Sequence, residues 1–302
     1  MRFKMFFMLV AVFFFITTHT SAEHRFVKDG VGRTVRVPVN PKRVVSLAPS
    51  VTEIIYELRQ GHRLKGATRF SDFPPEADRL PKVGSYIHLD LERIVSLKPD
   101  LCIAIKDGNP IEEIKRLESL NVSVFAINSI GFSTLMESIR SIGSLLDSSR
   151  QADVLIGDLT RRIEIVKERV ADADKRPGVF FQIGITPIVS AGSDTFIHEL
   201  IELAGGRNLA RGATSYPRYS REQVLLLAPD VIIITSMSRN KAFIKSKKAW
   251  NSWPQLPAVR NKSVFIVDSN LFDRPTSRLV SGLEILASLL HPEQFKKGKL
   301  EK

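Results

Sequence analysis

An internal repeat is the feature that most constrains the fold of this chain. Residues 91–104 read LERIVSLKPDLCIA, and residues 221–234 read REQVLLLAPDVIII. Both copies pass from a short amphipathic segment through a Pro-Asp pair into an apolar run. Because proline disfavours the helical conformation of the residue before it, a helix must end there and an extended segment must begin. The repeat therefore predicts two similar halves, each with a helix that leads into a buried strand.

An earlier strand and helix in each half complete the prediction of the fold. In the first half a strand at 43–48 leads into a helix at 51–58, and in the second a strand at 179–183 leads toward a helix at 196–204. Nearly continuous apolar runs of this kind are typical of strands buried on both faces of a parallel sheet. Strands that alternate with helices predict the α/β class. We expect two Rossmann-like lobes with parallel sheets.

A long helix is predicted between the two lobes. From about residue 150 to 172 the apolar residues recur at helical spacing, and an Arg-Pro-Gly run at 176–178 ends the segment. A helix of about 20 residues is roughly 30 Å long, so we expect one rigid helix that joins the lobes. The expected division of the chain is a signal peptide at 1–22, an N-terminal lobe at 23–148, the interlobe helix at 149–176, a C-terminal lobe at 177–292 and a basic tail at 293–302.

The amino terminus has the pattern of a secretory signal peptide. Arg2 and Lys4 precede an apolar run at 5–16, and small residues at 20–22 offer a cleavage site. The apolar run is shorter than the ~20 residues of a membrane-spanning helix. The chain has one cysteine, Cys102, so no internal disulfide can form, and no cysteine near residue 22 could carry a lipid. We expect a free periplasmic protein in which Cys102 is a buried structural thiol.

The formal net charge of +12 raises the question of nucleic-acid binding. The basic residues are dispersed along the chain, and their only dense run is the short tail at the carboxyl terminus. We therefore expect no nucleic acid as a partner. An anionic ligand or a membrane surface would be a milder explanation for the excess of basic residues.

Candidate ligand contacts follow the predicted strands. In parallel sheets ligands bind beyond the carboxyl ends of the strands, and boundaries between domains are favoured sites. The segments that meet this criterion are 48–50, 71–75 and 84–86 in the first half and 184–187, 216–217 and 270–274 in the second.

Four motifs carry a resemblance to a known family. They are SDFPP at 71–75, LERIVSLKPDLCIA at 91–104, SREQVLLLAPD at 220–230 and NLFDRPTSR at 270–278. From about residue 41 to residue 291 the chain closely resembles the periplasmic cobalamin-binding proteins of ABC importers. These belong to a superfamily of helical-backbone binding proteins that also serves iron siderophores, haem and some metals. The resemblance implies a binding protein that captures cobalamin between its lobes and delivers it to the importer.

The resemblance also implies which residues hold the ligand. Tyr86 and Tyr216 occupy positions where better-known cobalamin binders carry tryptophan, and Asp273 matches a polar contact. Phe73 and Ser71 of the SDFPP motif are further candidates, although Phe73 could equally anchor its loop. The implied cobalamin is a transported ligand and not a cofactor. An iron siderophore or haem remains the alternative, because the scaffold is shared and the basic surplus suits an anionic chelate.

Two repeated glutamates are implied to dock the protein onto its transporter. Family members use one acidic residue per lobe to meet arginines of the permease subunits, and the matching residues here are Glu92 and Glu222. We expect a monomer that docks peripherally on the transporter at the inner membrane. Asp100 and Asp230 repeat as well, and we interpret them as structural residues of the turn before each strand.

Enzymatic and metal-binding functions have weaker support in the sequence. Ser193, Asp194 and His198 lack the G-x-S-x-G pattern of a nucleophile elbow, and the HELIE run at 198–202 has glutamate where a zinc helix needs its second histidine. A zinc or manganese site would have to pool His62, His88, His198 and Asp268, which do not follow matching strands. We therefore expect no enzyme, no catalytic residue and no metal site. Trp250 and Trp253 are expected to pack in the lobe.

Overall fold

The computed structural model describes residues 23–235 and 242–296. The predicted signal peptide at 1–22 and the end of the predicted basic tail, 297–302, lie outside the described residues. The beginning of that tail belongs to a short helix, α12 (Pro292–Lys296).

The N-terminal lobe contains a four-stranded parallel sheet in the order β4-β3-β5-β6. Its strands are β3 (Val44–Ser46), β4 (Leu64–Gly66), β5 (Leu101–Ile105) and β6 (Val124–Ile127). Its helices are α1 (Pro49–Glu57), α2 (Leu91–Ser96), α3 (Ile111–Ser119) and α4 (Phe132–Leu145), with short 3₁₀ turns at Gly61–Arg63 and Pro75–Arg79. An antiparallel hairpin of β1 (His24–Lys28) and β2 (Thr34–Pro38), which the sequence analysis did not predict, precedes the sheet and contacts β6.

The C-terminal lobe has a mixed sheet around a parallel centre. Strand β11 (Val231–Ile234) lies parallel to both β7 (Gly178–Ile185) and β12 (Val264–Ile266), while β8 (Ile188–Ser190) folds back antiparallel on β7. Only Thr186 and Pro187 connect β7 to β8, and so short a connection joins antiparallel strands. The remaining elements are β9 (Arg207–Asn208), β10 (Arg218–Tyr219), α6 (Phe196–Leu203), α7 (Arg221–Leu227), α8 (Ala242–Asn251), α9 (Pro257–Arg260), α10 (Ser269–Phe272) and α11 (Arg278–Leu290).

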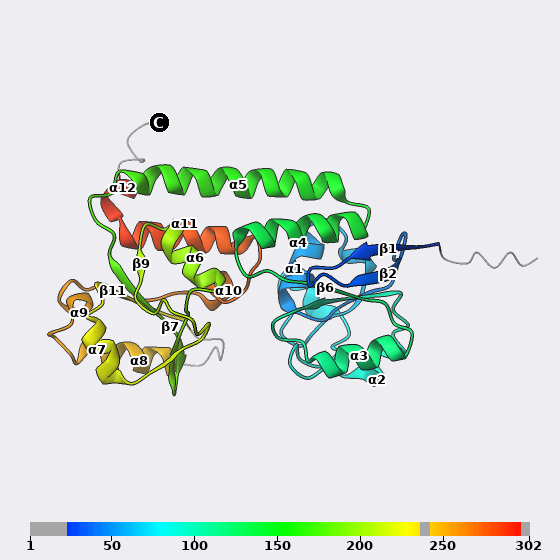
Figure 1. Ribbon diagram of the computed structural model, residues 1–302, viewed down its shortest axis with the longest axis horizontal. Coiled ribbons are helices and arrows are strands. Elements are labelled where there is room, and N and C mark those ends of the chain that lie inside the picture. The colour runs from blue at the N-terminus through cyan, green and yellow to red at the C-terminus, as the bar shows by residue number, and fades with distance from the viewer. Residues whose placement is uncertain (1–22, 236–241, 297–302) are drawn as a thin grey trace, which may run out of the picture.

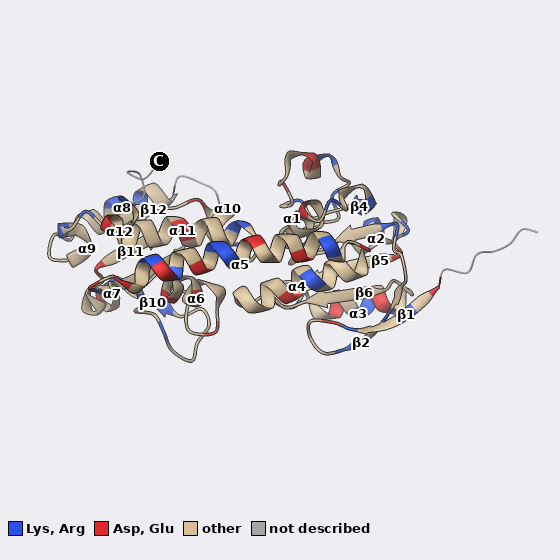
Figure 2. Cartoon of the chain, turned by 90° about the horizontal axis from the view of Figure 1, so that it is seen from above, with Lys and Arg blue, Asp and Glu red and all other residues tan. Residues whose placement is uncertain are grey.

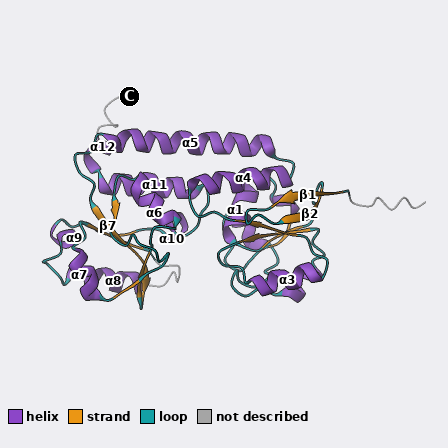
Figure 3. Ribbon diagram, viewed as in Figure 1, coloured by secondary structure: helices purple, strands orange, loops and turns teal. Residues whose placement is uncertain are grey.

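Helix α5 (Ser149–Ala171) runs along both lobes, with α4 of the N-terminal lobe and α11 of the C-terminal lobe beneath it (Figure 1). Its 23 residues correspond to about 34 Å. Leu159, Ile163 and Val166 are buried on its inner side, and acidic and basic residues alternate along its exposed side (Figure 2). The predicted fold class is confirmed: two α/β lobes are joined by one long helix, with helices on the faces of both sheets (Figure 3).

One apolar core is continuous between the lobes and two smaller cores belong to one lobe each. The continuous core includes residues of α1 and α4 in one lobe, of α5, and of α6 and α11 in the other. Cys102 is buried in the smaller N-terminal core, and this burial raises the pKa of its thiol. Trp250 is buried in the smaller C-terminal core, where its indole N–H donates to Gln182 Oε1 at 2.8 Å, and Trp253 packs against the same core.

The repeated aspartates, Asp100 and Asp230, make equivalent hydrogen bonds to a neighbouring strand in the two lobes. Asp100 accepts hydrogen bonds from the backbone N–H groups of Lys42 and Arg43, just before β3, at 2.7 and 3.0 Å. Asp230 accepts from the N–H of Gly178, the first residue of β7, at 2.7 Å. Each carboxylate thus ties the start of its own strand to the start of the neighbouring strand, which confirms the structural interpretation of both residues.

Candidate ligand site between the lobes

Segments that follow the strands of the two lobes meet at the lobe boundary. Arg274, which follows α10 in the C-terminal lobe, donates to Glu53 Oε1 at 2.9 Å, to Asp72 Oδ1 at 3.2 Å and to the carbonyl oxygen of Phe70 at 3.1 Å. Glu53 lies on α1 directly after β3, and residues 70–72 follow β4. The contacts therefore join loops at the carboxyl ends of both sheets, which is where ligands bind in α/β folds.

Tyr86 is half-buried on the N-terminal side of this boundary. Its ring meets the edge of the Phe70 ring at a centroid distance of 6.0 Å, and its carbonyl oxygen accepts from Asn109 Nδ2 at 2.7 Å. Gly108 has a φ of +135°, which residues with side chains rarely adopt, and a Cβ there would lie 3.0 Å from the Tyr86 ring and push against it. Burial raises the pKa of the Tyr86 hydroxyl, and the charges of Arg274 and Asp273 also act on it. Tyr86 is thus close to charged groups of the other lobe.

Tyr216 approaches the boundary from the C-terminal lobe. Its side chain is 50% exposed, and burial of the remainder raises the pKa of its hydroxyl. The second contribution to this shift comes from Asp107, a residue of the N-terminal lobe that follows β5. The structure therefore brings both predicted tyrosines to the same boundary, one from each lobe. The supporting loop at 107–109 was not predicted, because it has no distinctive motif and can be recognised only as a segment that follows a strand.

Asp273 is buried and incompletely paired. Its Oδ2 accepts from the hydroxyl of Thr235, the residue after β11, at 3.0 Å. Its Oδ1 is also buried and has no hydrogen-bond partner among the described residues. Burial raises the pKa of this carboxyl from 3.8 to about 7, despite the opposing effects of Thr235 and Arg274. A buried oxygen without a partner is costly, and a hydrogen-bond donor on a ligand would satisfy it.

The two candidates of the SDFPP motif differ in position. Phe73 is 38% exposed, and the guanidinium carbon of Arg278 lies 4.0 Å from its ring centroid. Ser71 is only 1% exposed, and its hydroxyl is within 3.0 Å of those of Thr52 and Thr68. The interpretation of Ser71 as a ligand contact is therefore corrected, because its hydroxyl is already used in holding the loop that carries Phe73.

Glu92 and Glu222 occupy equivalent places in the two lobes. Both are exposed in the first turn of their helices, α2 and α7, whose N-caps are the side chains of Asp90 and Ser220. Hydrogen bonds from its own backbone N–H and from the Ser220 hydroxyl hold the pKa of Glu222 below its usual value. Helices α2 and α7 lie on the side of the lobes that faces away from α5 (Figure 1).

The histidine and serine considered above for metal binding or hydrolysis make local hydrogen bonds in the structure. Within residues 23–235 and 242–296, no group of three or more His, Cys, Asp or Glu side chains is placed to hold a metal ion. His198 Nδ1 is 3.2 Å from Asn208 Nδ2, and Ser193 Oγ accepts from the N–H of Gly212 at 3.1 Å. The structure thus gives His198 and Ser193 local structural partners.

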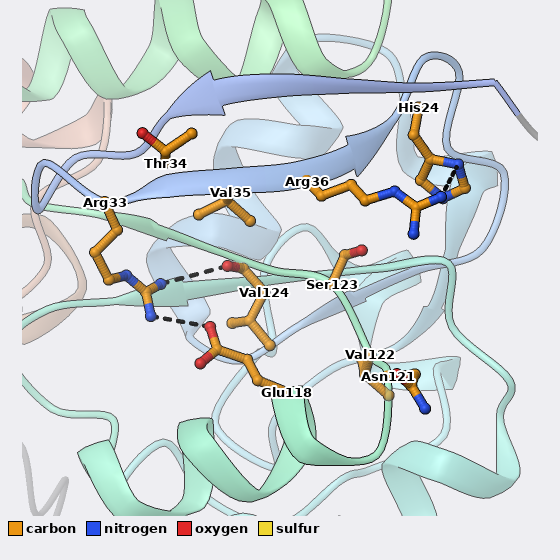
Figure 4. A pocket seen from close by; sticks show the side chains of 10 residues that line it. All are labelled: His24, Arg33, Thr34, Val35, Arg36, Glu118, Asn121, Val122, Ser123 and Val124. Carbon is orange, nitrogen blue, oxygen red and sulfur yellow. Dashed lines mark hydrogen bonds and ion pairs between the residues drawn. The ribbon is translucent and has the colours of Figure 1, made fainter.

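A separate hollow of about 430 Å³ lies beside the β1–β2 hairpin (Figure 4). Its lining includes the residues before β6, at the opposite end of that strand from the lobe boundary. Arg33 at its edge is already bound to Asp29, Glu118 and the carbonyl oxygen of Val124. None of the predicted ligand residues lines this hollow, so we place the candidate site at the lobe boundary.

Aromatic and carboxyl side chains at the boundary of two lobes, with a helix that spans both, define a two-lobed α/β binding protein. The sequence matches the family described as periplasmic binding protein over residues 44–271, and the chain belongs to this family. It is a substrate-binding protein of the ABC-transporter type. Among the described residues, no helix has the length and apolarity that crossing a membrane requires.

Relatives with known names lie within the predicted superfamily. The chain is 30% identical to the uncharacterized ABC transporter substrate-binding lipoprotein YvrC of Bacillus subtilis, over 89% of this chain and 86% of the relative. It is similar to the crystal structure of the periplasmic vitamin B12 binding protein BtuF of Vibrio cholerae, with a TM-score of 0.75, 28% identity, and coverage of 85% of this chain and 99% of that one. A periplasmic heme binding protein from Pseudomonas aeruginosa is similar with a TM-score of 0.77 and 26% identity, over 84% of this chain and 94% of that chain. The predicted membership of the superfamily is confirmed.

Proposed function

We propose that this protein captures cobalamin or a related corrinoid at the lobe boundary and delivers it to an ABC importer. The observation that carries the proposal is that Tyr86 and Tyr216 belong to opposite lobes and each lies near a charged residue of the other lobe, while the buried Oδ1 of Asp273 has no hydrogen-bond partner among the described residues. Similarity to a vitamin B12 binding protein over nearly the whole of that chain supports the same assignment.

The chemistry of the site suits a macrocycle with neutral polar groups at its edge. Tyrosine rings offer flat apolar faces for contact with a corrin and hydroxyls for hydrogen bonds. A carboxyl whose pKa is about 7 can donate or accept a hydrogen bond near neutral pH, so Asp273 can meet an amide of the ligand. None of the proposed ligand residues is a histidine, and we infer that the protein supplies no ligand to the cobalt.

Haem is the second candidate, and the tyrosines themselves favour it, because tyrosine is an axial ligand of haem iron in some proteins. The similarity to a heme binding protein points the same way. Against this, burial raises the pKa of both phenols, which disfavours the phenolate that would ligate iron. We therefore rank a corrinoid as the first candidate ligand, ahead of haem and ferric siderophores.

We further propose that the protein is exported to the periplasm without a lipid anchor, acts as a monomer and is not an enzyme. Its partners are the ligand and the permease subunits, which it meets through Glu92 and Glu222. The ligand is a transported molecule, and we assign no resident cofactor and no metal ion to the protein.

Calorimetric titration of the purified protein with cyanocobalamin, haemin and a ferric siderophore tests the ligand. We expect one cyanocobalamin to bind per chain. The visible spectrum of aquacobalamin should keep its position on binding, because no protein atom replaces the water on cobalt. Heat from haemin or the siderophore, with none from any corrinoid, would overturn the proposal.

A further inference from the structure

A buried carboxylate of one lobe holds two arginines of the other. Glu53, on α1, is 1% exposed. Its Oε1 accepts from Arg274 Nη1 at 2.9 Å and from Arg278 Nη2 at 2.6 Å, and its Oε2 accepts from Arg278 Nε at 2.8 Å. Charge-assisted and bidentate bonds of this kind are the strongest and most directional hydrogen bonds in proteins. One side chain therefore fixes both ends of the segment 274–278.

Both arginines continue to residues of the candidate ligand site. Arg274 directly follows Asp273 in the chain, and it also binds the Phe70 carbonyl oxygen and Asp72 of the opposite loop. Arg278 lies over the ring of Phe73. Through Arg274, Glu53 is thus linked to the segment that carries Asp273 in the C-terminal lobe. Through Arg278 it is linked to the Phe73 ring in its own lobe.

We propose that Glu53 is a positioning residue for ligand binding, because through Arg274 and Arg278 it sets the places of Asp273 and of the loop at residues 70–73. Glu53 itself does not reach the ligand, since it is buried behind the arginines. Sites whose supporting residues are held in this way keep the geometry that binding needs, and loosening the support weakens the site even when every contact residue is present. The proposal rests on the proposed function, because it takes the lobe boundary as the ligand site.

The alternative is that Glu53 only clamps the lobes together. A second ion pair in the chain, between α5 and α11, shows what the loss of paired bonds to an arginine does by itself. Arg162 on α5 binds Glu284 on α11 through two bonds of 2.9 and 2.8 Å, so its geometry matches that of the Arg278–Glu53 pair. This pair touches neither Asp273 nor the loop at 70–73. Glu284→Gln is therefore a control for the loss of paired bonds to an arginine. Glu199→Gln, which changes a carboxylate that accepts from the Phe132 N–H across the lobe boundary, is the control for clamping and should leave exchange at 69–74 and 273–276 unchanged.

The first measurement needs no ligand. Hydrogen exchange of the unliganded protein should be faster at residues 69–74 and 273–276 in Glu53→Gln than in the wild type, and unchanged there in Glu284→Gln. The second measurement is titration with cyanocobalamin, together with the circular dichroism that the bound corrinoid shows in visible light. We expect Glu53→Gln to lose at least about tenfold in affinity, the change that 1.4 kcal/mol produces, with an altered visible band. Glu284→Gln should stay within about twofold of the wild type in affinity.

The proposal is overturned if folded Glu53→Gln exchanges and binds as the wild type does, or if Glu284→Gln shows equal losses. Should Glu53→Gln fail to fold, Arg278→Lys decides, because it keeps the charge but removes the paired bonds and the flat group over Phe73. Wild-type affinity and loop exchange in Arg278→Lys then overturn the proposal, and losses in both support it. If the wild type binds no cyanocobalamin, the proposed function fails separately, and hydrogen exchange alone decides the role of Glu53.

Discussion

The carboxyl of Asp273 is buried, and its Oδ1 has no hydrogen-bond partner among the described residues, so this site lowers the stability of the fold. Burial raises the pKa of its carboxyl from 3.8 to about 7, so the folded protein holds a proton that the unfolded chain has already lost above pH 4. The free energy of unfolding therefore falls as the pH rises from about 4 to about 7, and the loss persists at higher pH. A binding site that weakens its own fold in this way is a common exchange of stability for function.

Replacement of Asp273 by asparagine tests this account at the level of one residue. Asparagine keeps the shape and the bond to Thr235 but cannot ionise. We expect Asp273→Asn to raise the free energy of unfolding by about 1–4 kcal/mol at pH 8 and to have little effect near pH 4. Urea denaturation at both pH values measures the difference, with the exposed Asp194→Asn as control. An equal effect of Asp273→Asn at both pH values would show that its charge is not the cause.

Sequence alone could suggest candidate ligand contacts but not the residues that support them. Asp273 lies in the motif at 270–278, and Tyr86 and Tyr216 were candidates through the family resemblance, so all three could be proposed before the structure was known. Glu53 lies 221 residues from Arg274, and no local pattern links the two. Ser71 was misread because a motif shows that a loop is important without showing which side chains point inward.

At the level of elements, the repeat was the most informative part of the sequence. It predicted α2 with β5 and α7 with β11, because a helix that must stop before proline is a local property of the chain. In both copies the residue before the proline has a positive φ, 49° at Lys98 and 45° at Ala228. The antiparallel strands β8 and β10 and the β1–β2 hairpin escaped prediction, since short strands with partly exposed residues leave no continuous apolar run.

The same repeat places Glu92 and Glu222, the proposed docking residues, at equivalent positions in the two lobes. Both carboxylates are exposed at the first turns of α2 and α7, on the side of the lobes away from α5 (Figure 1). Exposed charges of this kind act mainly on encounter and orientation. We expect the double variant Glu92→Lys/Glu222→Lys to bind ligand within about twofold of the wild type while its uptake falls at least about tenfold, since each lysine would face an arginine.

Uptake in cells and binding to membranes that contain the cognate transporter, at low and high salt, measure this effect. Glu112→Lys/Glu164→Lys, which changes two other exposed glutamates, controls for the added charge. Normal docking by the Glu92→Lys/Glu222→Lys protein would show that these glutamates serve only their own helices.

At the scale of the whole molecule, the contacts between the lobes oppose a large closing motion. Helix α5 packs on helices of both lobes, and the apolar core continues from one lobe to the other. Glu199 on α6 accepts from the backbone N–H of Phe132, the first residue of α4, at 2.7 Å, and Ser277 donates to the half-buried Glu57. Together with the bonds of Glu53, these contacts cross the boundary at separate points. A hinge motion between the lobes would have to break several of them at once.

We therefore expect the lobes to move by about 1 Å or less when ligand binds, as in complexes whose partners are already arranged for binding. Solution X-ray scattering with and without cyanocobalamin measures the change in radius of gyration. The double variant Glu53→Gln/Glu199→Gln removes two carboxylates that accept hydrogen bonds across the boundary. It should show a larger change than the wild type, because fewer polar contacts then resist bending. If the wild type compacts by several ångströms, beyond the small adjustments of preformed sites, then α5 bends and the lobes close as a hinge. If neither protein changes, the helix, the core and the remaining polar contacts are enough to hold the lobes in place, and these two carboxylates act only locally.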